Sequence, residues 1–423
     1  MTRNISRRQF MSLMGGVAAT AIGWGVSADD SDSLAPAQIK AAERIVQKLV
    51  SSNAVPGVTY SIGNMRRTLA TGAFGLRLIS PRAPMNRRTR SALASVSKQF
   101  VSAAAFLLQE RGALSLSAPL SEYVPEYIHA SEITLSQVLT MRSGIPALDE
   151  ICEAPIDGEI DEATLIANLN KHPLDFPPGR YFAYSNCAYN VAGVAIARVS
   201  GMSYGSFIEK NFFRPLGMRS SYQLGSIAIP NFAQGYAPDG SEWHVERFTT
   251  ADAAFASGNL ASTPTDLQRW NRSLLDATLL SPDTLNQIFT LPSTPDTVIS
   301  HYASGWLIEP SGIIWHPGAL NGYGTVNMLF PMTAHAITIL SNSAPSNRWD
   351  RGVRRSRCTM RRDSGRPCLR SCRWFEAPSQ KEVMAVPRSE YRGDVSAAWC
   401  RNSLCCRGLA APGGTSLARS VLR

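Results

Sequence analysis

The pattern of apolar and polar residues predicts strands near both ends of the main body of the chain and helices between them. Residues 33–50 carry apolar side chains at helical spacing, with a proline in the first turn. Residues 57–63 alternate apolar and polar side chains, which predicts a strand buried on one face, and residues 68–76 predict its return strand. Three or four further strands are predicted within residues 302–308, 312–316, 325–330 and 336–342.

The middle of the chain is predicted to be mostly helical. A helix is expected to begin near Ser95 and to end before Gly112, because glycine commonly follows a helix C-terminus. Further helices are predicted over residues 133–143, 190–200 and 263–275. The sequence has no βαβ alternation and no glycine-rich phosphate loop. These features predict an α+β protein, with a sheet domain and an all-helical insertion at about residues 113–250.

The composition describes a globular protein whose main body is nearly neutral. Of 423 residues, 44% are hydrophobic and 17% are charged, and the formal net charge is +10. About 16 of the basic and about 5 of the acidic residues lie in 351–423, so the preceding part carries almost no net charge. The main body therefore lacks the basic surface expected of a nucleic-acid-binding protein, and no nucleic-acid partner is expected.

Residues 1–28 are predicted to be an export signal. Residues 6–11 read SRRQFM, the form of a twin-arginine motif, and an apolar stretch follows as far as Trp24. The small residues at 26–28 predict a cleavage site, although a short membrane anchor is an alternative. No later segment has the apolar run needed to span a bilayer. We therefore expect a periplasmic or secreted protein, exported by the twin-arginine route and without a stable membrane span after cleavage.

The composition changes abruptly after the last predicted strand. Residues 346–423 are rich in arginine, cysteine, serine and tryptophan, and they show no sustained apolar period. A disordered basic arm, a small cysteine-rich module and a shifted reading frame beginning near 345–355 are the competing interpretations, and the abrupt change favours the last. We therefore expect one domain over residues 29–345, followed by an anomalous tail.

Two of the eight cysteines lie in the main body, at Cys152 and Cys187. The six others lie in the tail, and their spacing fits no zinc-binding pattern. The pair in the main body could form a disulfide in an oxidising compartment, but two separate buried thiols are the preferred interpretation. No metal and no cofactor are expected.

Ser95 and Lys98 form the first of three motifs with candidate chemistry. Residues three apart on a helix share one face, so the Lys98 amine should lie beside the Ser95 hydroxyl. A serine at a helix N-terminus also lies near the positive end of the helix dipole, which favours a developing alkoxide. Ser95 is therefore a candidate nucleophile with Lys98 as its activator. A surface serine near a solvated lysine is the alternative.

The other two motifs are weaker when taken alone. Tyr184 and Asn186 stand in a loop just before a predicted helix, where a turn asparagine and a packed tyrosine are also common. His316, Pro317 and Gly318 end the strand predicted over 312–316, where an exposed histidine and turn residues would have no functional meaning.

Together and in this order, the three motifs resemble the serine β-lactamase/penicillin-binding-protein superfamily. The resemblance is to the branch that holds class C β-lactamases, D-alanyl-D-alanine carboxypeptidases, D-aminopeptidases and related esterases. It runs from about residue 36 to residue 343 and includes the stretches PPGRYFAYSNCAYNVAG, LASTPTDLQRW and YASGW. It implies a β-lactamase/transpeptidase-like fold, in which an antiparallel sheet flanked by helices stands beside an all-helical subdomain.

The resemblance also implies a role for each motif. Ser95 would attack a carbonyl group and form an acyl-enzyme, with Lys98 or Tyr184 accepting its proton and the Lys98 charge lowering the pKa of Tyr184. The backbone N–H groups of Ser95 and Ala319 would bind the oxyanion. Asn186 would hold the acyl-side amide of a small-molecule or peptide substrate and help to position Lys98.

Two residues depart from the β-lactamase pattern. His316 replaces a lysine and is charged only part of the time near neutral pH, so its attraction to a substrate carboxylate should be weak and pH-dependent. Pro317 replaces a hydroxyl residue and removes a backbone N–H, which requires an edge strand or a non-bonding position. An esterase or D-peptidase is therefore expected rather than an efficient β-lactamase. A slowly acylating penicillin-binding or sensor protein and an inactive product of a damaged gene are the alternatives.

Proteins of this kind end in a helix that packs on the sheet. No amphipathic segment after residue 343 can supply that helix. One face of the sheet is therefore expected to be partly bare, with an exposed apolar patch.

Overall fold

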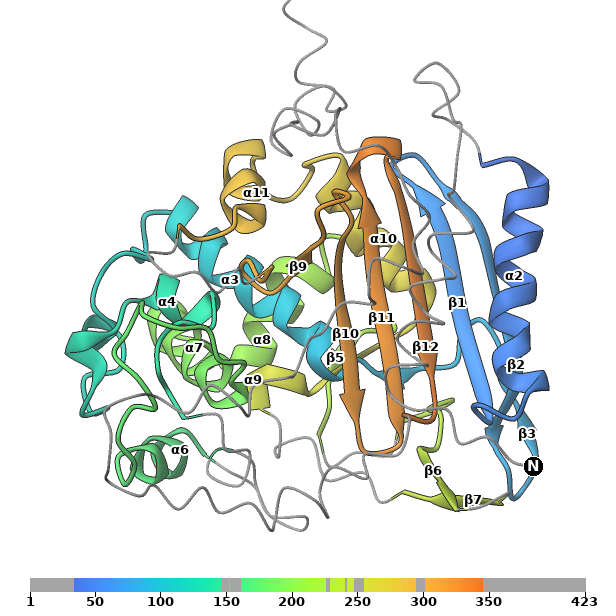
Figure 1. The fold of residues 1–423 in the computed structure, drawn as a ribbon, viewed down its shortest axis with the longest axis horizontal. Coiled ribbons are helices and arrows are strands. Elements are labelled where there is room, and N and C mark those ends of the chain that lie inside the picture. Colours follow the sequence, from blue (N-terminus) through green and yellow to red (C-terminus); the bar gives the residue numbers. More distant parts are fainter. Residues whose placement is uncertain are drawn as a thin grey trace, which may run out of the picture.

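The computed structural model describes residues 34–146, 152, 161–225, 229–239, 242–246, 255–293 and 301–344. In this part of the chain, a seven-stranded sheet stands beside a group of helices (Figure 1). The predicted signal at 1–28 and the tail at 346–423 lie outside the described residues.

The strands of the main sheet follow the order β3-β2-β1-β12-β11-β10-β9, and all neighbours are antiparallel. Their bounds are β1 Gly57–Asn64, β2 Thr68–Leu78, β3 Ala83–Pro84, β9 Leu307–Ile308, β10 Ile314–Leu320, β11 Tyr323–Phe330 and β12 His335–Ser341. The first and last of the described strands, β1 and β12, pair in the middle of the sheet, where Ile62 lies opposite Ile337. The predicted α+β class and antiparallel sheet are confirmed.

The helices occupy most of the positions that the apolar pattern predicted. Their bounds are α2 Pro36–Ser51, α3 Lys98–Glu110, α4 Leu135–Leu139, α6 Glu162–Leu169, α7 Asn186–Ser200, α8 Tyr204–Ile208, α9 Phe255–Gly258, α10 Pro264–Leu275 and α11 Pro282–Phe289. The helix predicted over 133–143 is shorter than expected. It ends at Leu139, and Met141 then adopts a left-handed backbone conformation with φ of 58°.

Two small sheets lie outside the main one in the described ranges. They consist of β4 Ser91–Ala92, β8 Leu260–Ser262 and β5 Tyr222–Gln223 in one, and of β6 Tyr236–Asp239 and β7 Glu242–Val245 in the other. Strands β5, β6 and β7 fall within the insertion at about 113–250, so the prediction that this insertion is all-helical is wrong. Tyr222 pairs with Ala261 beyond the insertion, a long-range partner that a local sequence pattern does not reveal.

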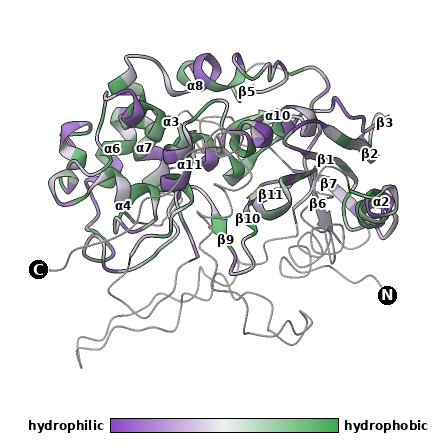
Figure 2. Ribbon diagram, turned by 90° about the horizontal axis from the view of Figure 1, so that it is seen from above, coloured by the Kyte–Doolittle hydropathy of each residue, from purple (hydrophilic) through white to green (hydrophobic). Residues whose placement is uncertain are grey.

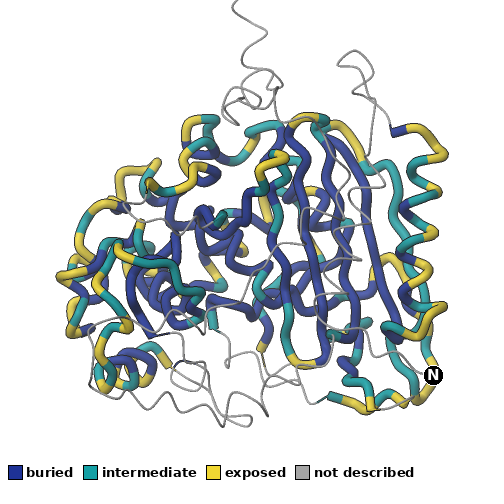
Figure 3. Tube along the Cα trace, viewed as in Figure 1, coloured by how far each residue is buried: buried dark blue, intermediate teal, exposed yellow. Residues whose placement is uncertain are grey.

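Strand β1 is buried on both faces, so the prediction of a strand buried on one face is wrong (Figure 3). Its apolar residues, such as Tyr60, join a cluster with α2. Its polar residues face α10, where the Ser61 hydroxyl donates a hydrogen bond to the Pro264 carbonyl at 2.9 Å. The alternation of apolar and polar residues therefore reflects packing against α2 on one face and against α10 on the other. The polar residues can be buried because a hydroxyl with a hydrogen-bond acceptor is tolerated in a core.

The sheet face that was expected to be partly bare is buried. Val326, Met328 and Ile337 are at most 2% exposed and belong to one apolar cluster with Val46 and Leu49 of α2. Helix α2 carries both hydrophilic and hydrophobic residues when seen nearly end-on, as an amphipathic helix should (Figure 2). The described part of this face therefore presents no exposed apolar patch.

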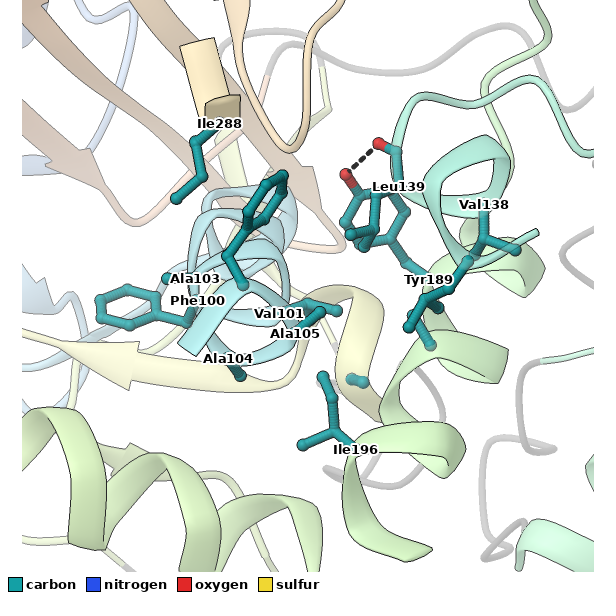
Figure 4. Close-up of a cluster of buried hydrophobic side chains, with 14 of the residues drawn as sticks. Phe100, Val101, Ala103, Ala104, Ala105, Val138, Leu139, Tyr189, Ile196 and Ile288 are labelled. Carbon is teal, nitrogen blue, oxygen red and sulfur yellow. Dashed lines mark hydrogen bonds between the residues drawn. The ribbon is translucent and has the colours of Figure 1, made fainter. Parts of the chain in front are cut away.

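Helix α3 runs through the core of the helical part, and this placement fixes the candidate nucleophile. Phe100 stacks on Trp270 of α10 with ring centroids 4.5 Å apart. On the other side of α3, Tyr189 of α7 donates a hydrogen bond to the Leu139 carbonyl at 2.6 Å (Figure 4). Eleven residues of α3, from Lys98 to Leu108, are buried, so the start of the helix is held on all sides.

No single helix among the described residues is both long and apolar enough to cross a membrane. One bent pair of helices, Asn186–Ser200 with Tyr204–Phe213, satisfies the same criteria by length and composition when the two are taken together.

Candidate active site

Lys98 is the first residue of α3, and its side chain is fully buried. Its Nζ atom lies 3.1 Å from Ser95 Oγ, 2.7 Å from Asn186 Oδ1 and 2.8 Å from the Ser257 carbonyl oxygen. An ammonium group has three N–H donors, and these three acceptors match them. The alternative of a solvated surface lysine is therefore wrong.

Ser95 lies in a single 3₁₀ turn, Ala94–Ser97, directly before α3. It is half-buried, whereas its neighbours Ala94 and Val96 are at most 1% exposed. Ala94 has φ of 48°, a conformation that costs a residue with a Cβ about 1–2 kcal/mol. The turn that carries Ser95 is thus held in an uncommon conformation at Ala94, and Ser95 is its most accessible residue.

The second motif lies against the same ammonium group. Lys98 Nζ is 5.0 Å from the centroid of the Tyr184 ring. Asn186 does not stand in a loop before the helix, as predicted, but is the first residue of α7. Ser185 caps this helix, because its side chain accepts a hydrogen bond from Ala188 N at 3.0 Å.

Gly318 brings the third motif against the serine turn. A Cβ atom at this position would lie 2.4 Å from the Leu93 carbonyl oxygen and 2.2 Å from Thr325 Oγ1. Thr325 in turn donates to that Leu93 oxygen at 2.8 Å. Only glycine therefore allows β10 to lie this close to the chain that carries Ser95.

The register of β10 directs the N–H of Ala319 away from β11. Ala319 lies opposite Gly324, and the Gly324 carbonyl accepts a hydrogen bond from Ser341 Oγ of β12 at 3.0 Å. The N–H and C=O groups of one strand residue point to the same side, so both groups of Gly324 point toward β12. Ala319, which lies opposite Gly324, therefore makes no backbone hydrogen bond to β11. The Ala319 N–H thus faces the free edge of β10, as the proposed oxyanion role requires.

The same alternation explains why a proline is tolerated in β10. Pro317 lies two residues before Ala319, so its nitrogen also faces away from β11. On that side β9 pairs only with Ile314 and Trp315 and ends before reaching Pro317. The prediction of a non-bonding or edge position for this proline is confirmed.

His316 is buried and neutral, which corrects the prediction of a partly charged residue with pH-dependent attraction. It is 2% exposed, and burial together with the positive charge of Lys98 lowers its pKa to about 3. Its Nδ1 lies 2.6 Å from the Pro317 carbonyl, which can only accept, so Nδ1 carries the proton. Its Nε2 then accepts from the Tyr302 hydroxyl at 3.1 Å.

Three contributors to the site were not predicted: Ser257, Tyr302 and Asn190. Ser257 acts through its backbone carbonyl, which no side-chain pattern reveals. Burial raises the pKa of Tyr302, so the hydroxyl keeps the proton that it offers to His316. Asn190 is a fully buried polar residue within an apolar helix, and that mismatch was a usable signal in the sequence.

Cys152 and Cys187 form a disulfide, so the preferred interpretation of two separate thiols is wrong. Their Cα atoms are 5.2 Å apart, a separation that residues 35 positions apart in sequence reach only through the fold. Among the described residues, no group of three or more histidine, cysteine or acidic side chains could hold a metal ion.

The fold and the three motifs together define a protein of the serine β-lactamase/penicillin-binding-protein superfamily. Comparison with protein families agrees, because the Beta-lactamase family model matches residues 42–357. The chain belongs to this family.

Two relatives and two solved structures illustrate the similarity. The chain is 27% identical over 263 residues to PbpX of Bacillus subtilis (strain 168), provisionally named a penicillin-binding protein, and covers 64% of its length. It is 24% identical over 316 residues to Protein flp of Staphylococcus aureus (strain NCTC 8325 / PS 47) and covers 62% of its length. The chain thus spans less than two thirds of these relatives, while 62% and 71% of the chain itself is matched.

Among solved structures, the octameric penicillin-binding protein homologue from Pyrococcus abyssi has 26% identity and a TM-score of 0.64, covering 72% of this chain and 73% of that one. The D-amino acid amidase from Ochrobactrum anthropi SV3 has 22% identity and a TM-score of 0.63, covering 70% of this chain and 89% of that one. The second similarity shows the fold alone.

Proposed function

We propose that this protein is a serine hydrolase that acts, through an acyl-enzyme on Ser95, on small esters and amides without a free carboxylate. The observation that carries the proposal is the Lys98 ammonium, which is buried and directed at Ser95 Oγ at 3.1 Å. A buried ammonium needs compensation from specific partners, and a partly exposed serine hydroxyl among them is typical of an activated nucleophile.

The chemistry follows from the donors and acceptors. Ser95 Oγ attacks the substrate carbonyl carbon, and the carbonyl oxygen becomes an oxyanion that receives the N–H groups of Ser95 and Ala319. Lys98 already donates to three acceptors and has no free lone pair in this state. The serine proton therefore goes to Tyr184, which accepts it as a phenolate beside the Lys98 ammonium and then passes it to the leaving alcohol or amine. A water molecule then attacks the carbonyl carbon of the acyl-enzyme, with Tyr184 again accepting the proton. The bond to Ser95 Oγ breaks, the carboxylic acid leaves and the Ser95 hydroxyl is restored.

The substrate class follows from the third motif. A substrate carboxylate would need a cation or a hydroxyl donor beside β10. His316 is uncharged with both ring nitrogens engaged, and Pro317 has neither a hydroxyl nor an N–H. Neutral esters and amides are therefore favoured over β-lactams and over peptides with a C-terminal carboxylate. The D-amino acid amidase among the structural neighbours is one protein of this fold whose named substrate class is an amide.

We also propose that the protein works in an oxidising compartment outside the cytoplasm. The twin-arginine pattern at 6–11 predicts export of a folded chain. The disulfide between Cys152 and Cys187 supports this placement, because such bonds persist mainly in the periplasm and in secreted proteins.

The proposed substrate class is tested with two esters of equal chain length. The expected kcat/KM for p-nitrophenyl butyrate exceeds that for mono-p-nitrophenyl succinate by at least tenfold, and nitrocefin is hydrolysed slowly. The Ser95→Ala protein is the control and should hydrolyse none of them. A preference for the succinate ester or for nitrocefin would overturn the proposed substrate class. Acylation of Ser95 without turnover would favour the alternative of a slowly acylating penicillin-binding or sensor protein.

A further inference from the structure

Two of the three acceptors of the Lys98 ammonium are linked to the Cys152–Cys187 disulfide, one through the chain and one through hydrogen bonds. The first acceptor is Asn186 Oδ1, and Asn186 is the chain neighbour of Cys187 in the first turn of α7. A helix end is the part of a helix most prone to fray. The disulfide therefore fixes the residue next to this acceptor to a second, distant part of the chain.

The other acceptor reaches the same disulfide through Asn190. Lys98 Nζ donates to the Ser257 carbonyl at 2.8 Å, and the N–H of the same residue donates to Asn190 Oδ1 at 2.9 Å. Asn190 Nδ2 then donates to the Cys152 carbonyl at 3.0 Å. Ser257 and Asn190 are at most 1% exposed, and Cys152 is fully buried, so water does not compete for these bonds.

From these two routes we propose that the Cys152–Cys187 disulfide and Asn190 are positioning groups that hold Lys98 on Ser95 during acylation. The inference rests on the proposed function, because it assigns a role within that same reaction. The disulfide closes a loop of 35 residues, so without it the Cys152 carbonyl has far more positions to occupy. A reacting group displaced by about 1 Å can cost about 100-fold in rate.

The test uses Cys152→Ala, Cys187→Ala and the double variant, assayed on p-nitrophenyl butyrate. Each is expected to lose about 10- to 100-fold in kcat with little change in KM, and to shift the pH dependence of kcat. The three losses should be equal, because either single change already removes the bond. Additive losses, or a kcat and pH profile like those of the wild type, would overturn the proposal.

Two further variants separate positioning from simple loss of stability. Asn190→Ala leaves the disulfide intact and should lower kcat in the same way, even if the cysteine variants fold poorly. Val46→Ala removes buried methyl groups from α2, away from the site, and should lower the unfolding midpoint with kcat unchanged. An unchanged kcat in folded Asn190→Ala protein would contradict the proposal.

Failure of this inference is distinguishable from failure of the proposed function. A wild-type protein that neither hydrolyses esters nor is labelled at Ser95 by a fluorophosphonate would reject the function itself. Normal wild-type turnover together with unaffected variants would reject only the positioning role.

Discussion

Lys98 has a side chain that proteins seldom bury, and here it is buried completely with three acceptors around its ammonium. Replacing it by methionine keeps most of the volume and removes the charge. Lys98→Met is expected to lower kcat/KM about 10²- to 10⁴-fold, because Ser95 Oγ loses the ammonium that orients it for transfer of its proton to Tyr184. Lys48→Met, at an exposed position of α2, is the control and should leave ester hydrolysis unchanged. Near-normal activity of Lys98→Met would remove Lys98 from the mechanism.

His316 gives a prediction for the pH dependence of stability. In the unfolded chain a histidine binds a proton below about pH 6.5, whereas the folded protein resists protonation down to about pH 3. The unfolded state therefore binds more protons in this window, and the free energy of unfolding should fall as pH is lowered through it. The slope contributed by this residue is at most about 1.4 kcal/mol per pH unit.

Urea unfolding between pH 4 and pH 7 measures that slope. His316→Asn should flatten the loss of stability, and His244→Asn, at an exposed position of β7, should not. The kcat of the wild type should likewise show no histidine transition between pH 5 and pH 8. Equal slopes in wild type and His316→Asn would mean that the histidine is charged or exposed.

At this scale the sequence located the side chains but not their surroundings. The spacing of Ser95 and Lys98 predicted contact because helix residues three positions apart share a face, and the contact is present although Ser95 lies in the 3₁₀ turn before α3. The charge of His316 was predicted wrongly, because a pKa depends on burial and on neighbours that are distant in sequence. The Ser257 carbonyl was missed for the same reason: it lies 159 positions from Lys98.

Among the elements, the close approach of β10 to the serine turn depends on Gly318. In Gly318→Ala the new methyl group would meet the Leu93 backbone oxygen and Thr325 Oγ1, so β10 and the turn must separate. Because Ala319 follows directly, the oxyanion donors should move apart, and kcat is expected to fall about 10²- to 10³-fold. Gly225→Ala, whose methyl group meets open space, is the matched control. A kcat within a few-fold of wild type for Gly318→Ala would contradict this geometry.

Element types were predictable where local chemistry decides them. Thr263 caps α10 with its side chain, and Pro264 occupies the first turn, as their order in the sequence indicated. The length of α4 was not predictable, because the helix ends before the left-handed backbone conformation of Met141. The two-sided burial of β1 was not predictable either, because it depends on packing against α10. Short strands such as β5 exist only through partners far along the chain.

For the whole molecule, the pairing of β1 with β12 brings residues near 60 and 340 together. The two halves of the sheet can therefore pair only after the chain has been synthesised past residue 340. This order suits the export route that the N-terminus predicts, in which the chain crosses the membrane folded. Replacing Arg7 and Arg8 by lysine should therefore retain the protein in the cytoplasm, as cell fractionation would show. Arg3→Lys is the control, and export of the double variant at the wild-type level would reject this route.

The central claim is that Ser95 becomes acylated, and intact-protein mass spectrometry tests it most directly. The wild type, quenched in acid within the first turnovers of p-nitrophenyl butyrate, should gain one butyryl group, and peptide mapping should place it on Ser95. The Ser95→Ala protein should gain none. An adduct on another residue, or an equal adduct on Ser95→Ala, would contradict the account.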